Sequence, residues 1–413
     1  MRREKGRSSR RGLITAVMLF TCFAFLMLAL KDRNWQSVVL AFAVPAIIFV
    51  GTGLIPKLFP ADELLLSLTN FLCALGVLVL YRLSPDRGIT QAVNYGVGVG
   101  CMILCALLVR YVRNWRLLTV LMTLGSLALL VLPLIFGRER NGAKSWLEFG
   151  GRSVQPSEMV KLTMILSVSW LLSRRRTLLP ILFAGCCLLI LMLQKDLGTA
   201  LLYYGVTLVL LYAATGSLPL LTVGLAGGGG AAIAGYQMFA HVKKRVAIWL
   251  DPWQDISGTG YQIVQSLIAM VNGGLWGVGL GVGNASVIPA YYNDFIFTVI
   301  LHEFGMIFGL LVLCVYGLIV ARGIMIARRS RTLFHALLAT ACSALIALQT
   351  FVIIGGNIKL IPLTGVTLPF ISYGGTSLVS SLCVMGLLQG VASRNEAGVR
   401  EDRELAMREE QER

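Results

Sequence analysis

Apolar stretches long enough to cross a membrane recur along most of this chain. An α-helix rises about 1.5 Å per residue, so about 18 to 20 apolar residues span the hydrocarbon core of a bilayer. Stretches that approach or reach this length cover residues 13–30, 37–55, 63–81, 89–109, 116–136, 157–173, 178–194, 197–214, 218–239, 294–320, 333–354 and 370–391. The pattern predicts an all-α polytopic membrane protein with about twelve transmembrane helices.

Composition and charge agree with this class of protein. The chain is 56% hydrophobic and 14% charged, and its net charge is +16. The basic stretches "MRREKGRSSRRG", "RYVRNWR", "SRRR" and "ARRSR" all fall on one side of a twelve-span chain, so the positive-inside rule places them and both termini in the cytoplasm. Lys31, Arg33, Arg82 and Arg87 fall on the other side, against this trend. Membrane orientation explains the charge, and we expect no nucleic-acid partner.

The spans suggest four parts. We expect a basic tail at 1–12, two additional spans at 13–62, a membrane core at 63–393 and a charged tail at 394–413 that is helical or disordered. No small-residue cleavage site follows the first apolar run, so it is expected to be a retained span.

Two predicted outer loops, 137–156 and 240–293, are longer than simple connectors. The second contains an apolar, interfacial segment, "YQIVQSLIAMV", and then alternating glycines between Gly273 and Gly283. These glycines indicate irregular backbone in close contact with another element, and their spacing matches no nucleotide-binding fingerprint.

Charged residues inside the apolar pattern are candidates for chemistry. In "QPSEMVK", Glu158 and Lys161 are three residues apart on one helical face. They form either a stabilising pair at a helix start or part of a water-filled cavity, and the cost of charge facing lipid favours the cavity. In "QKDLGTA", Asp196 is expected to cap the next helix. Arg245, in "RVAIWLDPWQD", could anchor a phosphate.

The stretch "YYNDFIFTVILHEFG" places Asp294 at the start of a span and Glu303 inside it. Asn293 or Asp294 would make an ordinary N-cap, which this stretch alone favours, and Asp294 could instead be a functional carboxylate. Nine helical residues put Glu303 about 180° round the axis, so the two acids need different roles. Further on, "IPLTGVTLPFISYGGTS" predicts broken backbone at membrane depth, which is tolerated where it is buried or lines a cavity. The histidines and serines match neither a zinc site nor a serine nucleophile motif.

Five motifs, in order, carry a family resemblance: "NGAKSWLEFGGRSVQPSEMVK", "QKDLGTA", "DPWQDISGTGYQIVQSLIAMVNGGLWGVGLG", "NDFIFTVILHEFG" and "IPLTGVTLPFISYGGTSLV". Together they resemble the SEDS family of shape, elongation, division and sporulation proteins over roughly residues 63–395. The resemblance implies a ten-span core in the bacterial plasma membrane that polymerises lipid II into glycan strands. It also implies a class B penicillin-binding protein as transpeptidase partner.

By position, the resemblance makes Asp294 the essential acidic residue and pairs Glu158 with Lys161 in a central cavity. Expected substrate-binding residues are Glu158, Lys161, Arg245, Glu303, Gln155, Ser372 and Tyr373. The chain departs from the family pattern at Lys195, Ala290, Tyr291, Tyr292 and His302, and these departures concern the substrate mouth.

The expected reaction is an inverting glycosyl transfer from an undecaprenyl-diphosphate-linked disaccharide-pentapeptide. Asp294 would take the proton of the acceptor hydroxyl, while Arg245 and Lys161 would stabilise the departing diphosphate. A divalent cation, Mg²⁺ or Mn²⁺, is left open, and Asp294 could instead be its ligand. A lipid II flippase or a noncatalytic scaffold for a cell-wall synthase are the alternatives.

Overall fold

The computed structural model describes residues 2–112, 114–140, 143–149, 152–284 and 287–411. Its N-terminal elements are α1 (Arg2–Asp32), α2 (Trp35–Phe49), the π-helix η1 (Val50–Leu54) and α3 (Ile55–Leu58). The following elements are α4 (Glu63–Leu83), α5 (Pro85–Tyr111), α6 (Trp115–Phe136), β1 (Arg138–Arg140), β2 (Ala143–Phe149), β3 (Arg152–Val154), α7 (Pro156–Ser173), α8 (Leu178–Leu193), α9 (Leu197–Thr215) and α10 (Leu218–Met238). The last are α11 (Ala240–Leu250), the 3₁₀ helix η2 (Pro252–Asp255), α12 (Tyr261–Gly273), α13 (Ile296–Arg328), α14 (Leu333–Asn357) and α15 (Gly375–Gln411).

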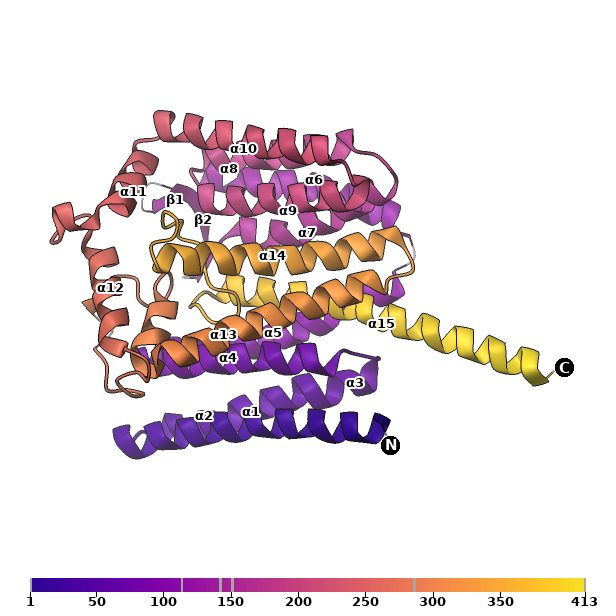
Figure 1. Ribbon diagram of the computed structural model, residues 1–413, viewed down its shortest axis with the longest axis horizontal. Coiled ribbons are helices and arrows are strands. Elements are labelled where there is room, and N and C mark those ends of the chain that lie inside the picture. The colour runs from indigo at the N-terminus through magenta and orange to yellow at the C-terminus, as the bar shows by residue number, and fades with distance from the viewer. Residues whose placement is uncertain (1, 113, 141–142, 150–151, 285–286, 412–413) are drawn as a thin grey trace.

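The long helices run side by side in one bundle, which confirms the predicted fold class (Figure 1). Within the described residues, ten helices are long and apolar enough to cross a membrane. The remaining two expected spans are present as α7 and α8, of 18 and 16 residues. Both chain ends lie at one end of the bundle, here called the terminal end, and α11, α12 and the strands lie at the other, the loop end.

The helices at the centre of the bundle are the most buried ones. The spanning windows of α4, α15 and α14 are 89%, 83% and 72% buried, whereas that of α10 is 6% buried. The α1–α2 pair packs against α4 and extends to α5, on the outside of this centre.

The two long loops are more ordered than the sequence suggested. Residues 137–156 contain an antiparallel sheet in the order β1-β2-β3, which the all-α prediction missed. In the second loop, the expected apolar segment is α12, and the basic stretch before it forms the unpredicted helix α11. The tail after Arg394 continues α15 as a helix, one of the two expected outcomes.

The glycine series packs against a break in α13. Gly305 leaves the helix with φ 84° and ψ 171°. The freed backbone bonds to the loop instead, because Met306 N donates to Gly274 O at 3.0 Å and Gly279 N donates to Glu303 O at 3.0 Å. Gly277 has φ 80°, and a Cβ there would lie 2.3 Å from Glu303 O. The close backbone contact predicted from the glycines is confirmed.

Gly277→Ala is therefore expected to lower the free energy of unfolding by more than about 1 kcal/mol, because alanine meets both a left-handed φ and a backbone overlap. Thermal unfolding of the purified protein in detergent measures the loss. Gly229→Ala in α10 is the matched control, since a Cβ there has nothing within 4 Å. Equal melting temperatures for both variants would contradict the packing described.

Candidate functional site

Asp294 lies at the loop end, two residues before the start of α13. The helix begins at Ile296, its N-cap is Phe295, and the N-cap makes no side-chain hydrogen bond. The capping role that local sequence allowed for Asp294 is therefore wrong. Its backbone carbonyl accepts a hydrogen bond from Asn357 Nδ2 at 2.6 Å, which fixes the residue against the end of α14. The carboxylate therefore does not bond to the start of α13 and can interact with the residues around it.

Those surroundings are Arg245 of α11 and a turn at Gly365. A Cβ on Gly365 would lie 3.8 Å from Asp294 Oδ2 and 4.0 Å from Arg245 Nη2, so both side chains lie over this glycine. Arg245 Nη1 also donates to Thr364 O at 3.0 Å. Burial raises the pKa of Asp294 to about 6, and the positive charge of Arg245 limits the rise. A weakly basic carboxylate and a guanidinium therefore lie next to the same glycine, Gly365.

The irregular segment 358–374 contacts the residues that precede Asp294. Its helix-breaking residues predicted irregular backbone here. Ser372 Oγ donates to Asn293 O at 2.8 Å, and Tyr373 N donates to Tyr292 O at 2.9 Å. The Arg87 guanidinium lies 3.6 Å from the centre of the Tyr292 ring. Ser372 and Tyr373 therefore support the backbone that leads into Asp294, and their predicted contact with substrate stays a prediction.

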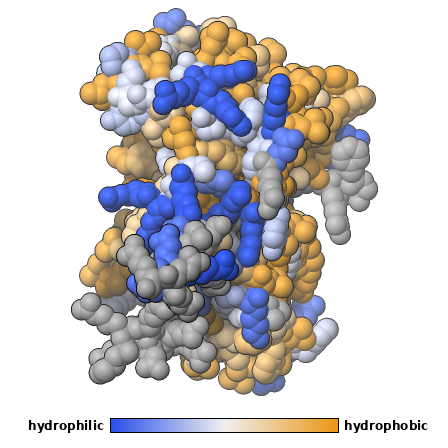
Figure 2. Space-filling model, turned by 90° about the vertical axis from the view of Figure 1, so that its right-hand side faces the viewer, coloured by the Kyte–Doolittle hydropathy of each residue, from blue (hydrophilic) through white to orange (hydrophobic). Residues whose placement is uncertain are grey.

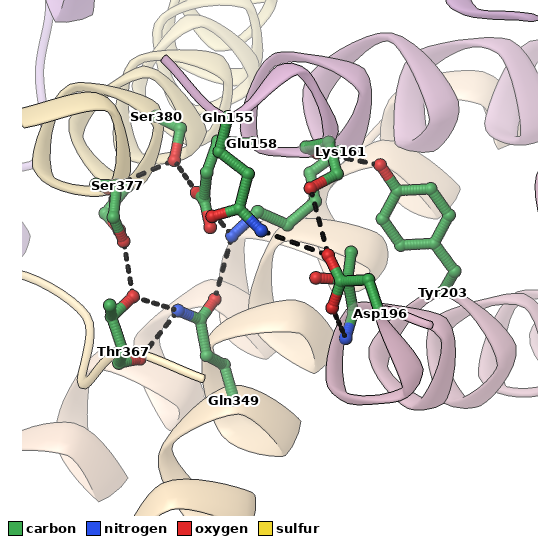
Figure 3. A network of polar contacts seen from close by, with 12 residues as sticks. Gln155, Glu158, Lys161, Asp196, Tyr203, Gln349, Thr367, Ser377 and Ser380 are labelled. Carbon is green, nitrogen blue, oxygen red and sulfur yellow. Dashed lines mark hydrogen bonds and ion pairs between the residues drawn. The ribbon is translucent and has the colours of Figure 1, made fainter. Parts of the chain in front are cut away.

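Glu158 and Lys161 form a buried pair inside the bundle (Figure 3). Lys161 Nζ lies 2.7 Å from Glu158 Oε2, and the two side chains are only 3% and 6% exposed. Ser380 Oγ of α15 donates to Glu158 Oε2 at 2.6 Å, and Lys161 Nζ donates to Gln349 Oε1 of α14 at 3.3 Å. The predicted pairing is confirmed, and the pair is buried among protein side chains, whereas the predicted water-filled cavity and the contact of Glu158 and Lys161 with substrate stay predictions.

Gln349 connects this pair to segment 358–374, and Asp196 and Gly198 of the α9 start lie on the other side of that segment's contacts with Arg245. Asp196 caps α9 as predicted, accepting from Thr199 N at 3.2 Å. Its other oxygen accepts from Gln155 Nε2 at 3.0 Å, which gives the predicted Gln155 a partner (Figure 3). Gly198 of α9 packs on Thr364, whose carbonyl binds Arg245, because a Cβ on Gly198 would lie 3.0 Å from Thr364 O. On the inner side, Gln349 Nε2 donates to Thr367 O at 2.8 Å.

Glu303 belongs to a different cluster. Its Oε1 lies 2.8 Å from Arg82 Nε, and its Oε2 accepts from Gly281 N at 3.4 Å. Lys31 Nζ, at the end of α1, donates to the carbonyl of Gly281. Glu303 therefore ties the glycine loop to α4, and its predicted contact with substrate stays a prediction. These contacts also give two of the basic residues on the predicted outer side, Lys31 and Arg82, a structural role.

Two basic residues near Arg245 were not singled out from the sequence as site residues. Burial and the positive charges of Arg245 and Lys195 lower the pKa of His241. His241 Nε2 is buried, and the described residues give it no hydrogen-bond partner. Lys195 was noted only as a departure from the family pattern, but it adds positive charge where Arg245 and His241 meet. This cluster suits a diphosphate.

A protein-made metal centre does not fit the described side chains. Among them, no three His, Cys, Asp or Glu residues gather closely enough to hold an ion. Asp294 could offer one carboxylate, but it has a guanidinium beside it.

Comparison with known proteins identifies the family of the chain. The model of the FtsW/RodA/SpoVE family, described as cell cycle proteins, matches residues 62–397. The chain is 34% identical over 367 residues to the peptidoglycan glycosyltransferase RodA of Mycobacterium tuberculosis, covering 80% of this chain and 78% of that protein. It is 34% identical over 355 residues to stage V sporulation protein E of Bacillus subtilis, covering 80% and 96%.

Two solved structures share the fold. One, from work on the coordination of polymerization and crosslinking by a peptidoglycan synthase complex, matches with a TM-score of 0.68 and 28% identity, over 81% of this chain and 98% of that one. The other, RodA of Thermus thermophilus, matches with a TM-score of 0.59 and 28% identity, over 82% and 98%. The chain is a multi-pass membrane protein that belongs to the FtsW/RodA/SpoVE family.

Proposed function

We propose that this protein is a peptidoglycan glycosyltransferase of the bacterial cell membrane, which polymerises lipid II on the outer face. Relatives that carry this name match four fifths of the chain. Under this proposal the loop end faces outward, and the polyprenyl tail of the substrate stays in the lipid beside the bundle. A class B penicillin-binding protein would crosslink the product, in line with the synthase complex among the structural relatives.

The observation that carries the proposal is the place of Asp294. Its carboxylate is not used to cap α13, lies beside Arg245 over Gly365, and is anchored through its backbone to Asn357. A base and a cation at one spot are what glycosyl transfer from a diphosphate requires. Neither a scaffold nor a simple helix end needs that combination.

The proposed reaction is a single displacement. Asp294 takes the proton from the acceptor C4 hydroxyl as its oxygen bonds to the anomeric carbon of the donor. The bond between that carbon and the diphosphate oxygen breaks on the opposite face, so the configuration inverts. The polyprenyl diphosphate leaves with the bonding electrons, and Arg245, with Lys195 near it, offsets the negative charge, while the uncharged His241 can donate a hydrogen bond. Glu158 and Lys161 shape the interior next to segment 358–374.

The pH profile should follow Asp294. Only the deprotonated carboxylate accepts a proton, and its pKa is about 6. The polymerisation rate is therefore expected to fall about tenfold per pH unit below that value and to level off above it. Initial rates with purified protein and lipid II between pH 4.5 and 8.5 measure the profile. An acid limb centred near 4 would argue against a desolvated base.

A lipid II assay with the purified protein separates the proposal from its rivals. Glycan strands in the absence of any other synthase support the glycosyltransferase. Movement of lipid II across a vesicle membrane without polymer would indicate a flippase instead. Neither activity, in a protein that still binds its transpeptidase partner, would indicate a scaffold.

A further inference from the structure

A basic pocket opens at the terminal end of the bundle, at the opposite end from Asp294. It has a volume of about 350 Å³, within the range of small-ligand sites, and Arg110, Arg331 and Arg394 contribute to its wall. These residues come from the end of α5, the α13–α14 connection and α15. Figure 2 views this end directly and shows hydrophilic side chains gathered across its middle, between apolar flanks.

Positive charge dominates the wall. None of the described residues that line the pocket is acidic. Arg110 Nη1 donates to the uncharged Ser393 Oγ at 3.1 Å, so this contact does not neutralise its guanidinium, and Arg394 Nη1 lies 3.3 Å from His335 Nε2. The pocket also includes Thr332, the N-cap of the 25-residue helix α14, where the helix dipole is positive.

Arg331, the third arginine of the pocket, is held in place by contacts with α15. The Arg331 guanidinium lies directly on the backbone of α15, because a Cβ at Gly398 would lie 2.5 Å from its Cζ. Its Nη2 pairs with Asp402 Oδ2, and the two side chains are 46% and 65% exposed. Asp402 therefore supplies an exposed carboxylate that an incoming anion could displace.

We propose that this pocket binds a phosphate group, carried either by an anionic lipid or by a soluble molecule. Arginine forks match phosphate oxygens two at a time, and the helix start adds to the attraction. Asp402 acts as an internal competitor for Arg331. Binding here would hold α5, α14 and α15 together at the end of the bundle away from the reaction.

Thermal unfolding of the full-length protein in a neutral detergent tests the site. One series adds inorganic phosphate at constant ionic strength, and another adds dioctanoyl phosphatidylglycerol, with dioctanoyl phosphatidylcholine as the zwitterionic comparison. We expect a saturable rise in melting temperature with at least one of the two anions. In Arg110→Gln/Arg394→Gln the half-saturating concentration should increase about tenfold or more. In Asp402→Asn it should decrease, because the competitor is gone.

Arg176→Gln, an exposed arginine at the same end but outside the pocket, is the control and should behave as the wild type. A response to phosphatidylglycerol alone assigns the phosphate to a lipid headgroup, and a response to inorganic phosphate shows that a soluble source suffices. Identical responses of the wild type, the double variant and Asp402→Asn would overturn the proposal. Asp402→Asn keeps the test decisive if the double variant does not fold.

Discussion

Asp294→Asn is expected to reduce the rate of glycan polymerisation by about a thousandfold while the protein stays folded. The amide keeps the shape of the side chain but cannot accept the proton, and a positioned base contributes roughly 10²- to 10⁴-fold. Initial rates with lipid II, at saturating substrate and pH 7.5, measure the loss. Asp86→Asn is the matched control, because Asp86 is an exposed acid at the same end of the bundle.

Asp294→Asn is expected to lower the reaction rate but not the stability of the folded protein. The folded-state pKa of Asp294, about 6, lies above its ordinary value of 3.8. Folding therefore favours the protonated form, and the stability this gives is fully present below pH 3.8 and lost as the pH rises through 6. At neutral pH the charged carboxylate destabilises the fold, so asparagine should keep or raise the melting temperature. A rate loss accompanied by a clear drop in melting temperature would instead mean a structural role.

Lys161→Met is expected to lower the free energy of unfolding by about 3 kcal/mol or more. It leaves Glu158 charged at a site where its side chain is 6% exposed, and removing one partner of a buried ion pair typically costs about 3 to 5 kcal/mol. Denaturant or thermal unfolding in detergent measures the change. Lys243→Met, at an exposed position on α11, should leave stability nearly unchanged.

The double variant Glu158→Gln/Lys161→Met makes the test specific. Without either charge, the remaining cost is that of a few hydrogen bonds to Ser380 and Gln349. The double variant should therefore lose less stability than the sum of the losses in Glu158→Gln and in Lys161→Met. Additive losses would show that the two charges do not stabilise each other in the folded protein.

Local chemistry was enough to predict features that depend on neighbouring residues. The apolar runs predicted the helices, the i,i+3 spacing predicted the pair of Glu158 and Lys161, and the short polar side chain of Asp196 predicted a cap. The glycine series predicted a close backbone contact. In each case the atoms concerned are near one another in sequence, or the residue type itself imposes the geometry.

Features set by distant parts of the chain could not be predicted in the same way. A cap was the better local interpretation of Asp294, but Asn357, Gly365 and Arg245, from three other segments, determine its position. The ion pair of Glu303 with Arg82 likewise joins helices far apart in the sequence. The strands of 137–156 form where the chain crosses the end of the bundle, and no long apolar alternation marks them.

The pair of N-terminal helices has a consequence for how this protein meets its neighbours in the bilayer. Helices α1 and α2 lie before the part of the chain that matches the family, and they occupy the flank of α4. Lys31 also fastens the end of α1 to the glycine loop. Any companion polypeptide crossing the same bilayer is therefore kept from the flank of α4 that this pair covers. It meets either another flank of the bundle, such as that of α10, whose spanning window is 6% buried, or the outer surface of the added pair.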